Sequence, residues 1–183
     1  MLKYALLGIL IYNPKTGYDL KQFMDVSTTY FWHAKLSQIY TTLKLLEEEG
    51  LVNSQIETRE ERPDRKVYTI TPAGKVALQA WLATPMMEIE PRKETLLLKL
   101  FFSAKLEKET LLMQLRLQRQ LHEQVLATYK HETVAVIQEA AAQFPSLQKD
   151  ALLWEATRRF GELYEAMYLD WLDQTIEIVI ANL

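Results

Sequence analysis

Cysteine is absent from this chain of 183 residues, and histidine occurs only at positions 33, 122 and 131. Without cysteine there is no disulfide bond, thiolate metal site or cysteine nucleophile, and the composition fits a reducing compartment such as the cytoplasm. His131 and Glu132 begin like the zinc-binding motif H-E-x-x-H, but residue 135 is alanine. We therefore expect neither a metal site nor another cofactor.

Glycine is also scarce: of five residues, all but Gly161 lie among the first 74. The sequence contains no glycine-rich phosphate loop, no dinucleotide-binding fingerprint and no G-x-S-x-G nucleophile elbow. The chain is therefore not expected to be an enzyme. The distribution of glycine suggests a compact, turn-rich N-terminal unit followed by long helices.

The net charge is only −3, with basic and acidic residues nearly balanced in the first 84 residues and an acidic excess after them. A sequence-specific DNA-binding protein needs a local basic patch rather than a basic total, so this charge permits DNA binding without arguing for it. Residues 1–12 are apolar but too short to span a bilayer, and Pro14 follows them. No membrane partner is expected.

The most informative stretch of the chain is residues 37–50, SQIYTTLKLLEEEG. Ile39, Leu43 and Leu46 recur at helical spacing and form one apolar stripe, while small polar residues fill the rest of the first half. Three glutamates precede Gly50, which can end a helix in the left-handed conformation. This polarity is typical of a recognition helix that meets DNA through its N-terminal residues, although an amphipathic helix with a solvated acidic end has the same pattern.

A β-hairpin is predicted directly after this helix, with strands at residues 51–58 and 66–71. The segment between the strands supplies a basic patch: Arg59, Arg62, Arg65 and the adjoining Lys66. Acidic residues dilute the charge of this segment, so a solvated hairpin end is the alternative interpretation. In the order of elements, however, the hairpin lies where a wing would contact phosphates beside the recognition helix.

Three helices are predicted before the hairpin, at residues 2–12, 18–26 and 37–49, with a turn at residues 13–17 and with Leu20, Phe23 and Met24 facing inward. After the hairpin, Thr71 caps a helix that ends before Pro85. Three helices, two strands joined by a basic loop, and a fourth helix make a winged helix-turn-helix. The predicted fold class is mainly α with a small β-hairpin, arranged as a DNA-binding domain (1–84), a linker (85–91) and a helical dimerisation or effector domain (92–183).

The C-terminal half is predicted to be helical at residues 94–103, 105–143 and 148–182. The last helix carries a long apolar stripe: Leu153, Ala156, Phe160, Leu163, Met167, Trp171 and Ile178. Two antiparallel helices cannot bury such broad faces against each other alone, and the simplest further partner is the same pair from a second chain. A homodimer through these helices would place two recognition helices about one DNA turn (~34 Å) apart, facing a palindrome.

Several stretches match a known pattern, among them TGYDL at residues 16–20, FWHAKLSQIY at 31–40 and VYTITPAGK at 67–75, together with residues 2–10 and 43–51. The sequence therefore resembles the PadR family of bacterial transcriptional regulators, and KETLLLKLFF (93–102) and YLDWL (168–172) resemble its longer-tailed subfamily. The resemblance implies a dimeric, usually repressing, winged-helix regulator. The founder of the subfamily is associated with sensing phenolic acids and controlling a decarboxylase that removes them.

The resemblance also implies DNA-contacting positions, because Ser37, Gln38 and Tyr40 match the start of the family's recognition helix and Tyr18 matches a tyrosine near its DNA face. The full set of expected DNA-binding residues is Tyr18, Lys35, Ser37, Gln38, Tyr40, Thr41, Lys44, Arg59, Arg62, Arg65 and Lys66. A site for a small aromatic effector is hypothesised near the domain junction, formed by Trp81, Phe101, Phe102, Tyr164, Tyr168 and Trp171. Aromatic residues at helical spacing are more often core residues.

We therefore expect a sequence-specific transcriptional regulator that acts as a repressor and is released from a palindromic operator by a small, phenolic or otherwise aromatic effector. The alternative is a protein-interaction module that acts through its C-terminal helices and uses the winged helix as a scaffold, since a fold does not by itself establish a function.

Overall fold

The structure is a computed structural model that describes residues 1–28, 31–59, 62–89 and 93–183. It consists of two compact units, Met1–Glu90 and Pro91–Leu183, and each is described by itself. None of the helices in the described ranges combines the length and the apolar composition that a membrane span requires.

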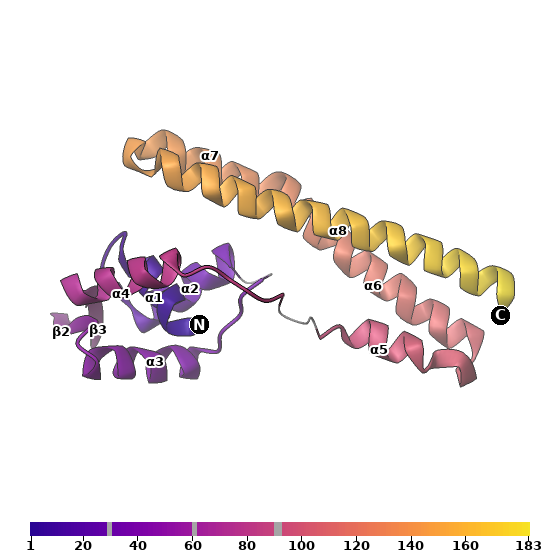
Figure 1. The fold of residues 1–183 in the computed structure, drawn as a ribbon, viewed down its shortest axis with the longest axis horizontal. Coiled ribbons are helices and arrows are strands. Elements are labelled where there is room, and N and C mark those ends of the chain that lie inside the picture. Colours follow the sequence, from indigo (N-terminus) through magenta and orange to yellow (C-terminus); the bar gives the residue numbers. More distant parts are fainter. Residues whose placement is uncertain (29–30, 60–61, 90–92) are drawn as a thin grey trace. The chain divides into compact units, whose positions relative to one another are not determined.

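The N-terminal unit contains four α-helices and a three-stranded sheet among its described residues (Figure 1). In chain order the elements are α1 (Leu2–Leu10), β1 (Lys15–Thr16), α2 (Gly17–Ser27), α3 (Leu36–Glu48), β2 (Val52–Arg59), β3 (Arg62–Ile70) and α4 (Pro72–Ala83). The predicted cap of α4 is confirmed, because the Thr71 hydroxyl accepts a hydrogen bond from the Gly74 N–H at 3.0 Å and Pro72 occupies the first turn.

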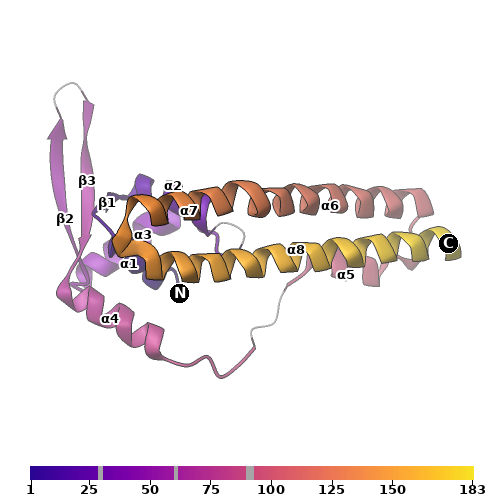
Figure 2. The ribbon, with the colours of Figure 1, turned by 90° about the horizontal axis from the view of Figure 1, so that it is seen from above.

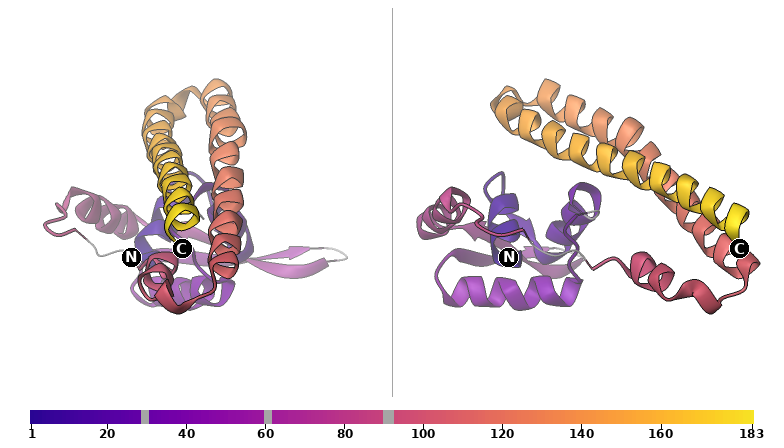
Figure 3. Two further views of the ribbon diagram at one scale, coloured as in Figure 1. Left: turned by 90° about the vertical axis from the view of Figure 1, so that its right-hand side faces the viewer. Right: turned by 45° about the vertical axis from the view of Figure 1, so that its right-hand side comes forward.

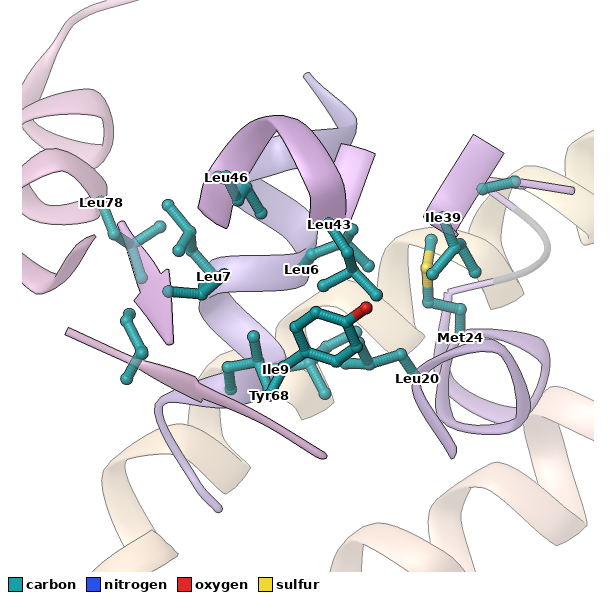
Figure 4. Close-up of a cluster of buried hydrophobic side chains, with 14 residues drawn as sticks. Leu6, Leu7, Ile9, Leu20, Met24, Ile39, Leu43, Leu46, Tyr68 and Leu78 are labelled. Atoms are coloured by element: carbon teal, nitrogen blue, oxygen red, sulfur yellow. The ribbon is translucent and has the colours of Figure 1, made fainter. Parts of the chain in front are cut away.

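The core of this unit forms where α1 and α3 meet (Figure 4). The apolar stripe predicted for α3 is confirmed as its core-facing side, because Ile39, Leu43 and Leu46 are fully buried. Each such side chain contributes roughly 1.5–3 kcal/mol by leaving water. The buried residues around them are Leu6, Leu7, Ile9, Leu10, Leu20, Met24, Ala34, Val52, Tyr68, Ile70 and Leu78.

Gly50 ends the α3 segment with a φ of 70°, as its position after the three glutamates predicts. The N–H of Leu51 donates to the carbonyl of Leu46 at 2.9 Å, and β2 begins at the next residue. The helix that carries the polar face is therefore joined to the hairpin by a single tight turn.

The sheet has the order β1-β3-β2 and is antiparallel, with Lys15 opposite Tyr68 and Ile56 opposite Lys66. The hairpin of β2 and β3 projects beyond the helices of its unit (Figure 3). The prediction of a turn at residues 13–17 was incomplete, because two of these residues form β1. A two-residue strand is too short to show alternation, and its pairing with β3 lies more than 50 positions away in the chain.

Two further predictions for this unit were wrong. β3 begins at Arg62 rather than at residue 66, because residues 62–65 pair with β2 although their sequence is charged and shows no apolar alternation. Phe23 was expected to face inward but is 36% exposed, and the ammonium group of Lys15 lies 5.6 Å from the centre of its ring.

The C-terminal unit is a helical hairpin with a short helix at its start (Figure 2). Its elements are α5 (Thr95–Phe101), the 3₁₀ turn η1 (Ser103–Lys105), α6 (Lys108–Thr128), the π-helix η2 (Tyr129–Thr133), α7 (Val134–Gln143), the 3₁₀ turn η3 (Pro145–Leu147) and α8 (Gln148–Asn182). The helix predicted at residues 148–182 is confirmed. The helices α6 and α8 run antiparallel and share a core of Leu111, Leu112, Leu115, Tyr168, Leu172 and Val179.

The helix predicted at residues 105–143 is interrupted by the π-helix η2. The guanidinium of Arg158, which is buried, donates to the carbonyl of Tyr129 at 3.0 Å, and Glu155 and Glu162 neutralise the charge. The Tyr129 ring occupies the space beside Gly161, where an added Cβ would lie 2.3 Å from a ring carbon. These contacts from α8 support a wide turn that the sequence of the segment alone does not indicate.

The apolar stripe predicted for α8 lies largely on the surface of the unit. Leu153, Phe160, Leu163, Met167 and Ile178 are each more than half exposed. The buried side of α8, which packs against α6 and η2, carries a different set of residues, including Gly161, Glu165, Tyr168 and Leu172. We call the exposed residues Leu153, Ala156, Phe160, Leu163 and Met167, which follow one another at three- and four-residue spacing, the α8 stripe.

Candidate nucleic-acid interface

One side of α3 is exposed and polar, opposite the side that the core holds. Ser37, Gln38, Tyr40, Thr41 and Lys44 are all exposed there, as is Lys35 immediately before the helix. The side-chain oxygen of Gln38 accepts the N–H of Lys35 at 2.8 Å and so caps the helix N-terminus, while its amide NH₂ stays on the outer side. The structure therefore brings the predicted recognition-helix residues together on one accessible face.

Contact between α2 and α3 adds a second tyrosine to this face. The ring of Tyr40 lies against Gly17, where a Cβ would be 2.5 Å from a ring carbon, so no larger residue fits at the start of α2 without displacing the ring. Tyr18 follows Gly17 in the chain and is 56% exposed. Glycine at position 17 thus allows the N-terminal ends of two helices to meet beside the same surface.

The start of α2 is held in place by a capping box and by β1. The N–H of Asp19 donates to the Thr16 hydroxyl and the N–H of Thr16 donates to the Asp19 carboxylate, both at 3.1 Å. Thr16 is also paired with Val67 of β3, which fixes the end of α2 to the sheet. Burial acts to raise the pKa of Asp19, but the hydrogen bonds from Thr16 and the charges of Arg65 and Lys15 outweigh it and lower that pKa.

The sequence suggests that the hairpin of β2 and β3, the wing, carries a patch of unpaired basic residues, but two of these residues form ion pairs in the structure. The Lys66 ammonium lies 2.7 Å from the carboxylate of Glu47 on α3, and Arg65 lies 2.6 Å from Glu57 on the opposite strand. The side chains of Arg59 and Arg62, also predicted to bind DNA, lie outside the described part of the structure. Among the wing cations whose side chains are described, both are thus ion-paired.

Glu47 is a residue that sequence reasoning did not single out. It accepts hydrogen bonds from Lys66 and from the hydroxyl of Ser54. The hydrogen bond from Lys66 is the largest cause of its lowered pKa, and the same bond raises the pKa of Lys66. Because the partners are 19 residues apart on a helix and a strand, no local pattern marks the pair.

The predicted effector residues do not form one group in the structure. Phe101, Tyr164, Tyr168 and Trp171 line an open hollow of about 920 Å³ in the C-terminal unit. Phe102 lines a second hollow, and Trp81 stacks on Tyr4 in the N-terminal unit with ring centres 4.8 Å apart. Four of the six residues predicted to bind an effector therefore line one hollow of the C-terminal unit.

This hollow has an aromatic wall with polar groups at its edge. The Tyr164 hydroxyl donates to Glu94 at 2.9 Å, and Lys93 adds a positive charge to the lining. Behind the wall, Tyr168 stacks on His122, whose ring nitrogen Nδ1 contacts Glu165. Burial is the main cause of the raised pKa of Tyr168, so its hydroxyl is neutral at physiological pH.

Comparisons with known proteins agree with this arrangement. The transcriptional regulator PadR-like family matches residues 6–80, and the family described as virulence activator alpha C-term matches residues 92–179. The negative transcriptional regulator PadR of Bacillus subtilis (strain 168) is 28% identical over 182 residues, which cover 98% of this chain and 97% of that protein. The matches extend over both units.

Two solved structures of Bacillus subtilis PadR are similar over nearly the whole chain. The complex with operator DNA has a TM-score of 0.82 and 26% identity and covers 97% of each chain. The complex with p-coumaric acid has a TM-score of 0.72 and 26% identity, and covers 97% of this chain and 98% of that one. These comparisons confirm the predicted fold class, and the relatives are transcriptional regulators rather than enzymes.

Replacing Asp19 with Asn tests the capping box that orients α2. Because the pKa of Asp19 is lower in the folded state than its ordinary value of 3.8, its stabilising effect is complete above pH 3.8 and is lost as the pH falls through the folded-state pKa. At pH 7 we expect the variant to be less stable by roughly 0.5–1 kcal/mol, the usual effect of a charge at a helix N-terminus. Urea unfolding followed by circular dichroism from pH 7 to pH 2.5 measures the difference.

The difference between Asp19→Asn and the unmodified chain should close in acid. Asp64→Asn, an exposed carboxylate on the hairpin, is the control and should show little difference at any pH. A difference for Asp19→Asn that stayed constant down to pH 2.5 would contradict a charge-dependent cap.

Proposed function

Because this chain belongs to the PadR-like family of transcriptional regulators, we propose that it binds a palindromic operator as a homodimer and represses transcription there. The observation that carries the proposal is the outer face of α3. Buried leucine and isoleucine residues hold the helix on the core, and polar side chains at its N-terminal half face outward beside a projecting hairpin. Such a helix fits the major groove, and its place of action would be the cytoplasm, with the DNA.

The residues of this face divide into two roles. Gln38, Ser37 and Thr41 carry amide or hydroxyl groups of the length that hydrogen-bonds base edges, so we assign them to sequence discrimination. Lys35 and Lys44 carry charges for phosphate groups, which fix the position of the protein on any sequence, and Arg65 adds a wing charge that Glu57 partly offsets. Tyr18 and Tyr40 complete the face from α2 and α3, and Arg59, Arg62 and Lys66 belong to the wing.

We assign residues 1–84 to DNA binding and residues 92–183 to dimerisation and effector response. The α8 stripe supports dimerisation, because a continuous apolar face of this length on a surface helix is unusual for a monomer. A second copy offers the same stripe in return, so that two α8 helices pack against each other around a twofold axis. Two winged helices held in this way would face two half-sites of a palindrome.

We further propose that the hollow beside α5 and α8 binds a planar aromatic acid that releases the operator. Trp171 and Phe101 offer ring surfaces for stacking, and Lys93 offers a cation for a carboxylate. The complex of the Bacillus subtilis relative with p-coumaric acid supports a ligand of this class. Release follows if the ligand binds more tightly to a form in which the recognition helices no longer match the half-sites.

Lys44→Gln and Gln38→Ala test the division of roles on α3. Lys44→Gln should weaken binding to operator and scrambled duplexes by the same factor and lower the salt slope by about one, since one phosphate contact is lost. Gln38→Ala should instead reduce the preference for the operator roughly tenfold, the effect of about 1–3 kcal/mol in base discrimination. Fluorescence anisotropy with the intergenic DNA beside the protein's own gene, at two salt concentrations, measures both effects.

In the same assay Lys75→Gln on α4 is the control for loss of a surface charge, and thermal melting checks that Gln38→Ala retains its fold without the cap. Equal and weak binding of the unmodified protein to both duplexes would contradict the regulator proposal for that DNA. It would favour a module that acts through its C-terminal helices.

Leu163→Glu tests the dimer. A charge in the centre of the α8 stripe should give a monomer, and operator affinity should fall at least tenfold because each half-site then binds alone. Sedimentation equilibrium measures the oligomeric state and anisotropy measures the operator affinity of the same samples. Leu163→Met, which keeps an apolar side chain, is the control. A dimeric Leu163→Glu variant with normal affinity would show that α8 is not the interface.

Phe101→Ala tests the effector hollow. We expect p-coumaric acid to raise the melting temperature of the unmodified protein and to release the operator, and expect Phe101→Ala to need about tenfold more acid for either effect because a ring contact is lost. The adjacent Phe102→Ala is the control, because Phe102 lies outside this hollow. Equal losses for the two variants would place the ligand elsewhere, and no response at all would exclude this acid as the effector.

A further inference from the structure

The wing and the recognition helix are joined by a small polar network centred on Glu47. One carboxylate oxygen of Glu47 accepts the hydroxyl of Ser54 on β2, and the other contacts the ammonium group of Lys66 on β3 at 2.7 Å. The ammonium also lies 5.2 Å from the centre of the Tyr68 ring. Both strands of the hairpin are thus connected to the last turn of α3 through one acidic residue.

We infer that Glu47 limits the DNA affinity of this protein by neutralising Lys66, the wing cation next to the recognition helix. The inference rests on the proposed DNA-binding function and adds to it a residue that determines how strongly any duplex is bound. Lys66 contributes to phosphate binding only to the extent that the phosphate displaces the Glu47 carboxylate or shares the ammonium with it.

The geometry keeps Glu47 beside Lys66. The buried residues Leu43 and Leu46 hold this part of α3 on the core, and the hydrogen bond from Ser54 orients the carboxylate. Lys66 is placed by its pairing with Ile56 on β2. The pair therefore forms from two rigid elements rather than from two side chains that meet by chance.

The adjacent Glu48 has a different environment. Among the described residues, Glu48 forms an ion pair with Lys44, one turn earlier on the same helix, at the longer distance of 3.8 Å. Glu47 and Glu48 carry the same charge at the same end of α3, so their comparison separates the Lys66 pair from the general repulsion between an acidic helix end and DNA.

The charge of the pair decides how it affects binding. Lys66 and Glu47 hold each other in their ionised forms, as the raised pKa of the first and the lowered pKa of the second indicate. Their charges sum to zero at the place where a phosphate would approach. Because DNA affinity depends on the number of uncompensated cations that release counterions, a neutralised lysine contributes little. The ion pair is partly exposed, so removing it should change stability only slightly.

The test measures anisotropy of full-length Glu47→Gln and Glu48→Gln with operator and scrambled duplexes over a range of salt concentrations. Glutamine retains an acceptor for Ser54 and removes the charge. We expect Glu47→Gln to bind both duplexes about three- to tenfold more tightly near 0.1 M salt, with a salt slope steeper by about 0.9, the effect of one additional phosphate contact. Glu48→Gln should increase affinity less than Glu47→Gln does, because the contact of Glu48 with Lys44 is longer and more exposed than the Glu47–Lys66 pair.

Lys66→Met completes a double-mutant cycle with Glu47→Gln. Its result alone does not depend on the folding of a Glu47 variant. Alone, Lys66→Met should lower affinity less than it does beside Glu47→Gln, because Glu47 already offsets the charge of the lysine. Combined with Glu47→Gln, it should remove the whole gain. This pattern would assign the effect to Lys66 rather than to helix charge.

Other outcomes would overturn the inference. An equal gain in DNA affinity for Glu47→Gln and Glu48→Gln would mean that Glu47 acts only through the general repulsion between an acidic helix end and DNA. Weaker binding by Glu47→Gln, or a large loss for Lys66→Met alone, would mean that Glu47 positions a lysine that already contacts phosphate. If the unmodified protein bound neither duplex at low salt, both the proposed function and this inference would fail. If the unmodified protein bound DNA but Glu47→Gln bound no more tightly, only the inference would fail.

Discussion

The contact between α1 and α3 is the interaction on which the candidate DNA-binding surface depends. Ile39, Leu43 and Leu46 are fully buried against the leucines of α1, and a helix held by one face must present the opposite face to solvent. The polar residues at the start of α3 are therefore exposed as a consequence of core packing. Gly17 extends the same surface, since the absence of a side chain there allows the Tyr40 ring to lie at the start of α2.

The hairpin shows how opposite charges can conceal a basic patch. By sequence the wing is rich in arginine and lysine, yet Lys66 and Arg65 each meet a carboxylate in the folded chain. Such pairs add little to stability in water, but they determine how much positive charge the surface offers to a polyanion. In the proposed complex, affinity for DNA would therefore depend on carboxylates that do not themselves touch it, such as Glu47 with its contacts to Ser54 and Lys66.

The C-terminal unit combines two features of the same helix. The inner side of α8 carries Tyr168 and Leu172 against α6, while its outer side carries the apolar α8 stripe. The inner side includes polar contacts as well, because Tyr168 stacks on His122 and Arg158 supports the wide turn at Tyr129. A partner on the stripe and a ligand in the hollow would therefore both act on a helix whose position the α6 contacts already determine.

The sequence by itself determined the order of elements, the buried stripe of α3, the turn at Gly50, the cap of α4 and the extent of α8, because periodicity, capping residues and glycine act over a few neighbouring positions. It also carried the resemblance to the PadR family, which the comparisons confirmed. Only the tertiary structure decided that residues 15–16 pair with β3, that a π-helix interrupts the segment after α6, that Trp81 stacks on Tyr4, and that Lys66 faces Glu47. Each of these depends on groups far apart in the chain, such as Tyr129 with Gly161, and no local pattern encodes which distant side chain will occupy the space beside a given residue.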